Sequence, residues 1–304
     1  MAVGNGMGIG IPMVNLGLGG GGGGGASFLL DDYPNTSGHS YSLRQLSSTV
    51  TNVVRVRRGS DNTEQDFTAA GITDGTLATF CGGSEGFVAK WYDQSGNSDV
   101  LNFTALQQPK IFVEDGIGGY EVLLQNGKPC MEFDGVDDSL QVLISLPPVN
   151  RAYYLFAVNT LVSAPGLGEP EVYMYGLKAD VPAPFDGKNS IKWGAGSSGS
   201  FYGSSSLGFG ASQGTQYLYY ARQQSAPGPF SGSTIKVNLT QNPISGFADN
   251  GAAPINTITL GDNPNNYAGQ HSNIKLQEFI LYFTDPALNG TAIESNINTH
   301  YSIY

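Results

Sequence analysis

Charged side chains are scarce in this chain of 304 residues, where Asp, Glu, Lys and Arg together make up 13%. That is about half of their share in an average globular protein. The 25 acidic residues outnumber the 14 basic ones, so the net charge is −11. A chain of this sign repels phosphates, and we exclude nucleic acid as a partner. The cluster of Arg55, Arg57 and Arg58 is expected to form ion pairs with nearby Asp or Glu residues.

Cysteine and histidine are rare as well. The two cysteines are Cys81 and Cys130, and the three histidines, His39, His271 and His300, have no partner at zinc-binding spacing. We therefore expect no cofactor. We favour two buried thiols over a disulfide, although the sequence leaves their pairing open. The chain shows no signal-peptide pattern and no apolar run long enough to span a membrane, which predicts folding in a reducing cytoplasm.

Residues 1–26 form a first region with no charged side chain, ending in seven consecutive glycines from Gly19 to Gly25. Polyglycine is costly to order, so we expect a flexible tether. Before it, apolar residues recur mostly at every second position, as in an extended segment. We predict that this arm docks on another subunit, with a disordered tail as the alternative. The docking residues would be Met7, Ile9, Ile11, Met13, Val14, Leu16 and Leu18.

The second region, residues 27–304, has the pattern of one all-β domain. Short alternating or β-branched segments are separated by Gly, Ser, Asn and Pro, which favours a sandwich over βαβ units. Examples are residues 54–57, 87–92, 153–158, 217–220 and 234–239. A helix is predicted over residues 289–301, with Thr291 and Glu294 at capping-box spacing and an apolar face that includes Ile293 and Ile297. Short helical turns are predicted at 42–48 and 75–80.

Three blocks of sequence carry a resemblance to a known family. The first holds residues 41–67 and then GFVAKWYDQSG at 86–96; the second is NGKPCMEFDGVDDSL at 126–140; the third comprises ITLGDN at 258–263 and QEFILY at 277–282. Together they resemble the catalytic domain of the α-L-arabinofuranosidase B family, a concanavalin A-like, laminin-G-like jelly roll that also occurs in many phage virion proteins. The resemblance spans roughly residues 28–304. The family's Cys-x4-Cys disulfide would need a cysteine at position 86, where this chain has Gly86.

The resemblance also implies a catalytic pattern, and this chain matches only part of it. A retaining glycosidase needs two carboxyl groups about 5–5.5 Å apart. Asp262, in Leu260-Gly261-Asp262-Asn263-Pro264, matches the family's acid/base position. The nucleophilic glutamate is missing, because residues 187–248 contain neither Asp nor Glu. We therefore expect no enzymatic activity and interpret Asp262 as a turn or capping residue.

Other polar residues have simple structural interpretations. Asp93 and Gln94, like Asp262 and Asn263, are expected in turns, with glycan binding as the alternative. Asp134, Asp137 and Asp138 are expected to be turn-forming residues, with Ca²⁺ ligation as the alternative.

These observations predict a structural protein of a tailed-phage virion: a capsid decoration, fibre or tail adhesion module. The N-terminal arm would anchor it to capsid or tail proteins, and the sandwich would bind host surface glycans. A homo-oligomer is compatible with this arrangement. The alternatives are an α-L-arabinofuranosidase-like glycoside hydrolase and a secreted carbohydrate-binding module.

Overall fold

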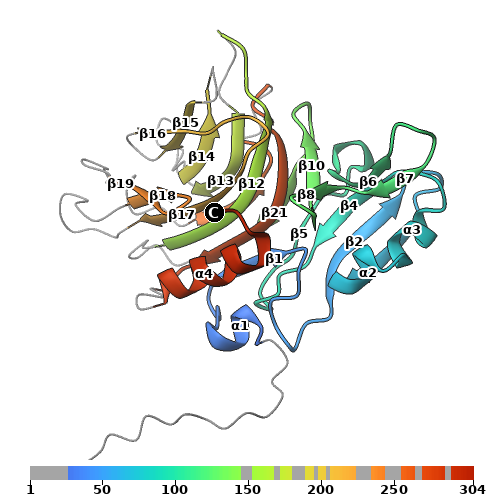
Figure 1. Cartoon of the computed structure of the whole chain (residues 1–304), viewed down its shortest axis with the longest axis horizontal. Helices are drawn as coiled ribbons and strands as arrows, with labels where there is room; N and C mark the ends of the chain where they lie inside the picture. Colours follow the sequence, from blue (N-terminus) through green and yellow to red (C-terminus); the bar gives the residue numbers. More distant parts are fainter. Residues whose placement is uncertain are drawn as a thin grey trace, which may run out of the picture.

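The fold is taken from a computed structural model of the chain (Figure 1). It describes residues 27–144, 153–167, 172–179, 189–194, 198–202, 206–223, 234–243, 255–263, 269–284 and 289–304. The predicted anchoring arm, residues 1–26, lies outside the described residues.

Strands dominate the described chain. The strands are β1 (His39–Ser42), β2 (Asn52–Arg58), β3 (Glu64–Thr68), β4 (Gly86–Trp91), β5 (Val100–Leu101), β6 (Lys110–Glu114), β7 (Tyr120–Val122), β8 (Leu124–Gln125), β9 (Lys128–Pro129), β10 (Met131–Asp134), β11 (Leu140–Leu143), β12 (Tyr153–Ser163), β13 (Val172–Ala179), β14 (Asn189–Trp193), β15 (Ser198–Tyr202), β16 (Ser206–Gly210), β17 (Gln216–Gln223), β18 (Thr234–Val237), β19 (Thr240–Pro243), β20 (Ile255–Leu260) and β21 (Asn273–Tyr282). The helices are α1 (Leu29–Asp32), α2 (Ala69–Thr73), α3 (Thr76–Cys81) and α4 (Gly290–Tyr301), with a 3-10 turn, η1, at Ala105–Gln107.

The strands form a curled antiparallel sheet whose two walls face each other, which confirms the predicted all-β sandwich class (Figure 1). One wall runs from β19 through β18, β17 and β12 to β21. The other runs from β16 through β15, β14, β13 and β20 to β11. Strands β5, β4 and β2 continue the second wall, and β6 joins it back to β10 and β21. The curl closes one large hydrophobic core between the walls.

Strand β12 shows why the sequence was apolar at consecutive positions here. It pairs with β21 on one side and β17 on the other, so its backbone is central in the sheet. Leu155 and Ala157 point into the core between the walls. Tyr154, Phe156 and Val158 point to the outer face, where a second apolar cluster is covered by α4 and α1. Because both faces are buried, the strand has no polar face and no alternation.

Helix α4 confirms the predicted C-terminal helix. Ile293, Ile297 and Tyr301 are buried against the sheet. The capping-box prediction was wrong: the N-cap is Asn289, and its side chain makes no capping hydrogen bond. Instead of capping the helix, Glu294 is buried and accepts a hydrogen bond from Nζ of Lys236 at 2.8 Å.

The short elements were predicted with mixed success. Helix α3 confirms the turn expected at 75–80. The helical turn expected at 42–48 is absent, because the Gln94 side chain occupies that segment's backbone groups: it accepts from the N–H of Leu46 and donates to the carbonyls of Ser42 and Arg44. A backbone bonded to a side chain in this way is not free to form the i→i−4 pattern. Helices α1 and α2 were not predicted.

The thiol and arginine predictions are confirmed in part. Cys81 and Cys130 are both buried and free. Arg55 pairs with Asp66 at 2.6 Å, and Arg58 pairs with Asp61 at 2.7 Å. Arg57, in contrast, is buried and donates to the Gln108 side chain at 2.7 Å. No helix among the described residues is long and apolar enough to cross a membrane.

Candidate functional site

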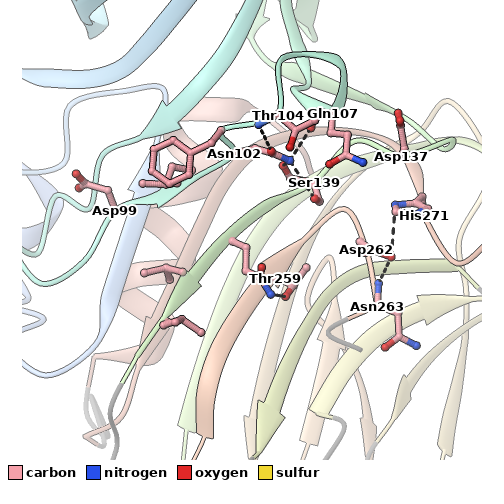
Figure 2. A pocket seen from close by; sticks show the side chains of 15 residues that line it. Asp99, Asn102, Thr104, Gln107, Asp137, Ser139, Thr259, Asp262, Asn263 and His271 are labelled. Atoms are coloured by element: carbon pink, nitrogen blue, oxygen red, sulfur yellow. Dashed lines mark hydrogen bonds and ion pairs between the residues drawn. The ribbon is translucent and has the colours of Figure 1, made fainter. Parts of the chain in front are cut away.

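The second wall carries an open pocket of ≈ 570 Å³, here called the Asp262 pocket. Its floor comes from the ends of β11 and β20, and its sides come from the segment after β5 and from the residues before β21 (Figure 2). Ligand pockets of small molecules usually have volumes of about 300–1,000 Å³. The lining residues are Asp99, Leu101, Asn102, Phe103, Thr104, Gln107, Asp137, Ser139, Gln141, Val142, Leu143, Thr259, Asp262, Asn263 and His271.

A glycine turn places Asp262 in this pocket. Strand β20 ends at Leu260, and Gly261 takes a positive φ of 82°. A Cβ at Gly261 would lie 2.2 Å from Cδ1 of Phe133, so only glycine fits. The backbone of Gly261 is held on both sides, since its N–H donates to the carbonyl of Met174 and its carbonyl accepts from the N–H of Ser272. Asp262 is therefore presented at a fixed position.

Asp262 is paired with His271. The two residues are buried, at 3% and 9% exposure, and Nδ1 of His271 lies 3.4 Å from Oδ1 of Asp262. That separation is too long for a strong hydrogen bond, so their interaction is mainly electrostatic. Burial raises the pKa of Asp262 to about 6, and the neighbouring imidazole opposes that rise. Oδ1 also accepts the N–H of Asn263 at 2.6 Å. The carboxyl thus has the turn contact expected from the sequence, together with the burial and raised pKa of a candidate acid.

The acidic loop after β10 lies next to this pair. Asp134 pairs with Asn273 in the β10–β21 ladder, and Gly135 packs against the backbone of Asn273. This register brings the loop close to His271, two residues before Asn273. Asp137 lines the Asp262 pocket, and Asp138 is buried behind it. Burial and the neighbouring Asp134 carboxylate raise the pKa of Asp138 to about 7.

The calcium alternative concerns the same loop. Carboxylate oxygens of Asp134, Asp137 and Asp138 all lie within 4.8 Å of one another. Three protein oxygens are fewer than the six to eight ligands that Ca²⁺ takes. The N–H groups of Val136 and Asp137 point to Oδ1 of Asp134, as expected for a turn. These contacts agree with the turn interpretation, and calcium ligation stays the untested alternative.

Asp93 and Gln94 were predicted as turn or glycan residues, and they do not line the Asp262 pocket. Both are buried and fully engaged within the protein. Asp93 accepts from Nδ1 of His39 at 2.7 Å and from the N–H groups of Ser40, Ser95 and Ser98. Their role is to hold β1 and the following segment against the end of β4.

Sequence reasoning missed three pocket residues: His271, Asn102 and Phe103. His271 lies beside Asp262 because the N–H of the next residue, Ser272, donates to the carbonyl of Gly261, and no local pattern reveals this contact. Asn102 had a weak local signal, since an Asn side chain often accepts the backbone N–H two residues further on, in an Asx turn. Its Oδ1 does accept the N–H of Thr104 at 2.8 Å.

Comparisons with known proteins identify relatives of the fold. No family model matches the chain, and no curated protein matches it by sequence. A variant of a GH54 α-L-arabinofuranosidase soaked with 4-nitrophenyl α-L-arabinofuranoside has a TM-score of 0.55 at 16% identity, covering 88% of this chain and 64% of that one. The same class of enzyme soaked with a cyclic sulfate inhibitor has a TM-score of 0.55 at 15% identity, covering 89% and 64%. Trypanosoma rangeli sialidase in complex with sialic acid has a TM-score of 0.45 at 14% identity, covering 69% and 31%.

These comparisons bear on two expectations from the sequence: the fold and the absence of enzymatic activity. The chain spans less than two thirds of the length of these enzymes. The feature that it shares with the arabinofuranosidases is the β-sandwich fold. The prediction that the chain is not an enzyme is contradicted, because the structures that match most of its length are glycoside hydrolases. At 15–16% identity the two arabinofuranosidase structures show the fold alone, and the tailed-phage assignment is not among what they show.

Proposed function

We propose that this chain is a glycoside hydrolase that cleaves α-L-arabinofuranosides, with Asp262 as its general acid. The observation that carries the proposal is a buried carboxyl group, facing an open pocket, whose pKa is raised to about 6. Such a group keeps its proton in mildly acidic solution and can donate it to a leaving oxygen. The fold match to an arabinofuranosidase over 88% of the chain, and the Gly261-Asp262-Asn263 sequence, both support this class.

Hydrolysis needs a second carboxylate, and Asp137 is the candidate. Residues 187–248, where the nucleophilic glutamate was expected, contain neither Asp nor Glu. The second carboxylate must therefore come from another part of the chain. Asp137 lines the same pocket, whereas Figure 2 shows Asp99 on the opposite side of the pocket from Asp262. In the proposed reaction Asp262 protonates the glycosidic oxygen as its bond to the anomeric carbon breaks. In one route the Asp137 carboxylate bonds to that carbon, and water, deprotonated by the Asp262 carboxylate, then displaces it to release the sugar; in the other route Asp137 removes a proton from the water that attacks the carbon directly.

The test is turnover of 4-nitrophenyl α-L-arabinofuranoside and of arabinan by the purified full chain. We expect Asp262→Asn and Asp137→Asn each to lower kcat/KM by roughly 10²- to 10⁴-fold. Asp74→Asn, at an exposed position outside the pocket, serves as the matched control and should leave it unchanged. The anomeric configuration of the first product, followed by NMR, distinguishes direct attack from water activation. Absence of turnover by the wild type, or full activity of Asp262→Asn, overturns the proposal.

Attachment to a tailed-phage virion through the arm is a separate proposal and is compatible with a hydrolase. It rests on the apolar strip from Met7 to Leu18. Charged substitutions at Ile9, Ile11 and Val14 should leave the protein folded but absent from purified particles. Mass spectrometry of particles would detect the chain, and a charged variant found there at the normal copy number would refute attachment through the arm.

A further inference from the structure

The Asp262 pocket has two kinds of surface. Its floor is polar, with Thr259 accepting a hydrogen bond from Nε2 of Gln141 at 3.3 Å beside Asp262 and Asn263. Its rim is apolar, because Phe103 is 91% exposed and Leu143 is 79% exposed. Exposed apolar side chains gathered at a pocket often mark a ligand-binding groove. A sugar matches this combination, since its hydroxyl groups project from the ring edge while the C–H groups form an apolar face.

Phe103 is exposed on a segment that is firmly held. The side chain of Asn102, the residue before it, donates to the carbonyls of Gln107 at 3.0 Å and Ser139 at 2.9 Å. The backbone of Asn102 is also bonded on both sides, to the carbonyl of Ala89 and to Nε2 of Gln108. The hydrogen bond from the N–H of Thr104 to Oδ1 of Asn102 closes the turn around Phe103. The ring is thus presented to solvent by an ordered turn, which lowers the entropic cost of binding a ligand on it.

The charge of the lining selects against acidic sugars. Three aspartates, Asp99, Asp137 and Asp262, line the pocket, and no Lys or Arg is found among its described lining residues. A carboxylate or sulfate on the ligand would face three aspartates, and His271, the titratable cation of this lining, is already beside Asp262. The electrostatics favour a neutral glycan.

We propose that the Asp262 pocket binds a neutral glycan chain of at least two sugar rings, with one ring over Asp262 and the next stacked on Phe103. The position of the first ring rests on the proposed function. The position of the second rests on the exposure of Phe103 and its fixed turn. An aromatic platform of this kind would make the protein prefer oligosaccharides over single sugars.

The experiment is calorimetric titration of the full chain with arabinotriose, xylotriose, cellotriose and maltotriose, compared with arabinose and with trigalacturonate. We expect at least one neutral trisaccharide to bind and trigalacturonate not to bind. Phe103→Ala should weaken trisaccharide binding by about fivefold to tenfold, and Phe103→Trp should retain it. Ile117→Ala is the matched control, because Ile117 is also 91% exposed but lies outside the pocket. It should bind like the wild type, and none of these variants should change the thermal transition.

Equal affinity of Phe103→Ala and the wild type would overturn the inference, as would binding of trigalacturonate or of no neutral trisaccharide. These outcomes are separable from those of the hydrolase test. Binding that depends on Phe103, without turnover, refutes hydrolysis and supports the platform. Turnover of 4-nitrophenyl α-L-arabinofuranoside, with no effect of Phe103 on trisaccharide affinity, refutes the platform alone.

Discussion

Sγ of Cys81 lies 2.9 Å from the position that a Cβ on Gly86 would occupy. In a disulfide, the Cβ of one cysteine lies about 3 Å from Sγ of the other, given an S–S bond of about 2.0 Å. The backbone between α3 and β4 is therefore placed for a Cys-x4-Cys bridge like that of the family which the sequence resembles, although this chain has Gly86 in place of the second cysteine. The position of Gly86 beside Cys81 is thus compatible with such a bridge.

Gly86→Cys should therefore form a disulfide with Cys81 under oxidising conditions. A bridge closing about six residues is expected to stabilise the fold by about 2 kcal/mol relative to the reduced variant. The reduced variant should be less stable than the wild type, because the new Cβ also approaches Phe112 and Val56 at 3.0 and 3.1 Å. Urea unfolding with and without reductant measures both effects. Gly86→Ala is the control and should be destabilised regardless of reductant; a Gly86→Cys variant that stays reduced under oxidation would contradict the geometry.

Most of the fold class was accessible from local sequence. The strands over 54–57, 87–92 and 153–158 each appear where alternation or β-branched runs placed them. The segment at 42–48 was misread because the side chain that holds it belongs to Gln94, about fifty residues away. Such long-range side-chain bonds carry no local periodicity, so short elements were the least predictable.

An ion pair joins Arg44, in the segment after β1, to Glu278 of β21, and both residues also hydrogen-bond helix α4, through Asn296 and Tyr301. The Glu278 side chain is fully buried and accepts two hydrogen bonds from Arg44, at 2.7 and 3.0 Å. Glu278→Leu should cost about 3–5 kcal/mol, because it leaves the Arg44 guanidinium buried without its partner. Adding Arg44→Met should restore part of that loss. Urea unfolding of the single and double variants measures the coupling. Arg55 and Asp66, an exposed pair, form the matched control and should couple by less than about 1 kcal/mol.

The described core begins just after the arm. Leu29 and Leu30 are buried in the outer cluster, and the N–H of Leu30 donates to the carbonyl of Leu46 at 2.8 Å. Deleting residues 1–26 should therefore leave the thermal transition nearly unchanged. Leu29→Ala in the same truncated chain should lower the free energy of unfolding by about 2–5 kcal/mol. Differential scanning calorimetry compares the three proteins, and a loss of cooperativity on deletion alone would show that the arm completes a sandwich.

The candidate site was less predictable than the fold. Asp262 was found from its match to a family motif, but its pairing with His271 depends on the backbone hydrogen bond from Ser272 to Gly261. Asp137 looked like a turn residue because its local sequence is that of a turn, and only the structure shows that it lines the same pocket as Asp262. The position of Phe103 at the pocket could not be predicted, because sequence alone does not distinguish an exposed aromatic side chain from one in the core.

Asp138 should make stability depend on pH. Burial and Asp134 raise the pKa of Asp138 to about 7 in the folded state, above the 3.8 of a free Asp side chain. Between about pH 4 and pH 7 the Asp138 carboxyl loses its proton in the unfolded chain and keeps it in the folded chain. The contribution of Asp138 to the free energy of unfolding therefore falls as pH rises. Asp138→Asn removes the cost of ionising a buried carboxyl at this position, and it keeps an oxygen that accepts the N–H of Asp134. The substitution should leave the free energy of unfolding nearly unchanged at pH 4 and raise it by on the order of 1–3 kcal/mol at pH 8.

Urea unfolding across this range in EDTA measures the Asp138 effect without interference from cations. Repeating it with excess Ca²⁺ tests the calcium alternative, since a bound ion would stabilise the wild type more than Asp138→Asn. An equal effect of the substitution at pH 4 and pH 8 would contradict the raised pKa.

The pair of Asp262 and His271 sets the pH range in which the proposed enzyme can work. A general acid must be protonated, so kcat/KM should fall as pH rises above about 6, the pKa of Asp262. The imidazole of His271 holds that pKa below the value that burial alone would give. His271→Gln should therefore move the alkaline limb of the profile to higher pH while leaving the Asp262 carboxyl in place. The pH dependence of kcat/KM on 4-nitrophenyl α-L-arabinofuranoside measures the shift. A loss of rate at every pH with no movement of the limb would show that His271 only supports the pocket, because a neighbouring charge that controls the acid must move its titration.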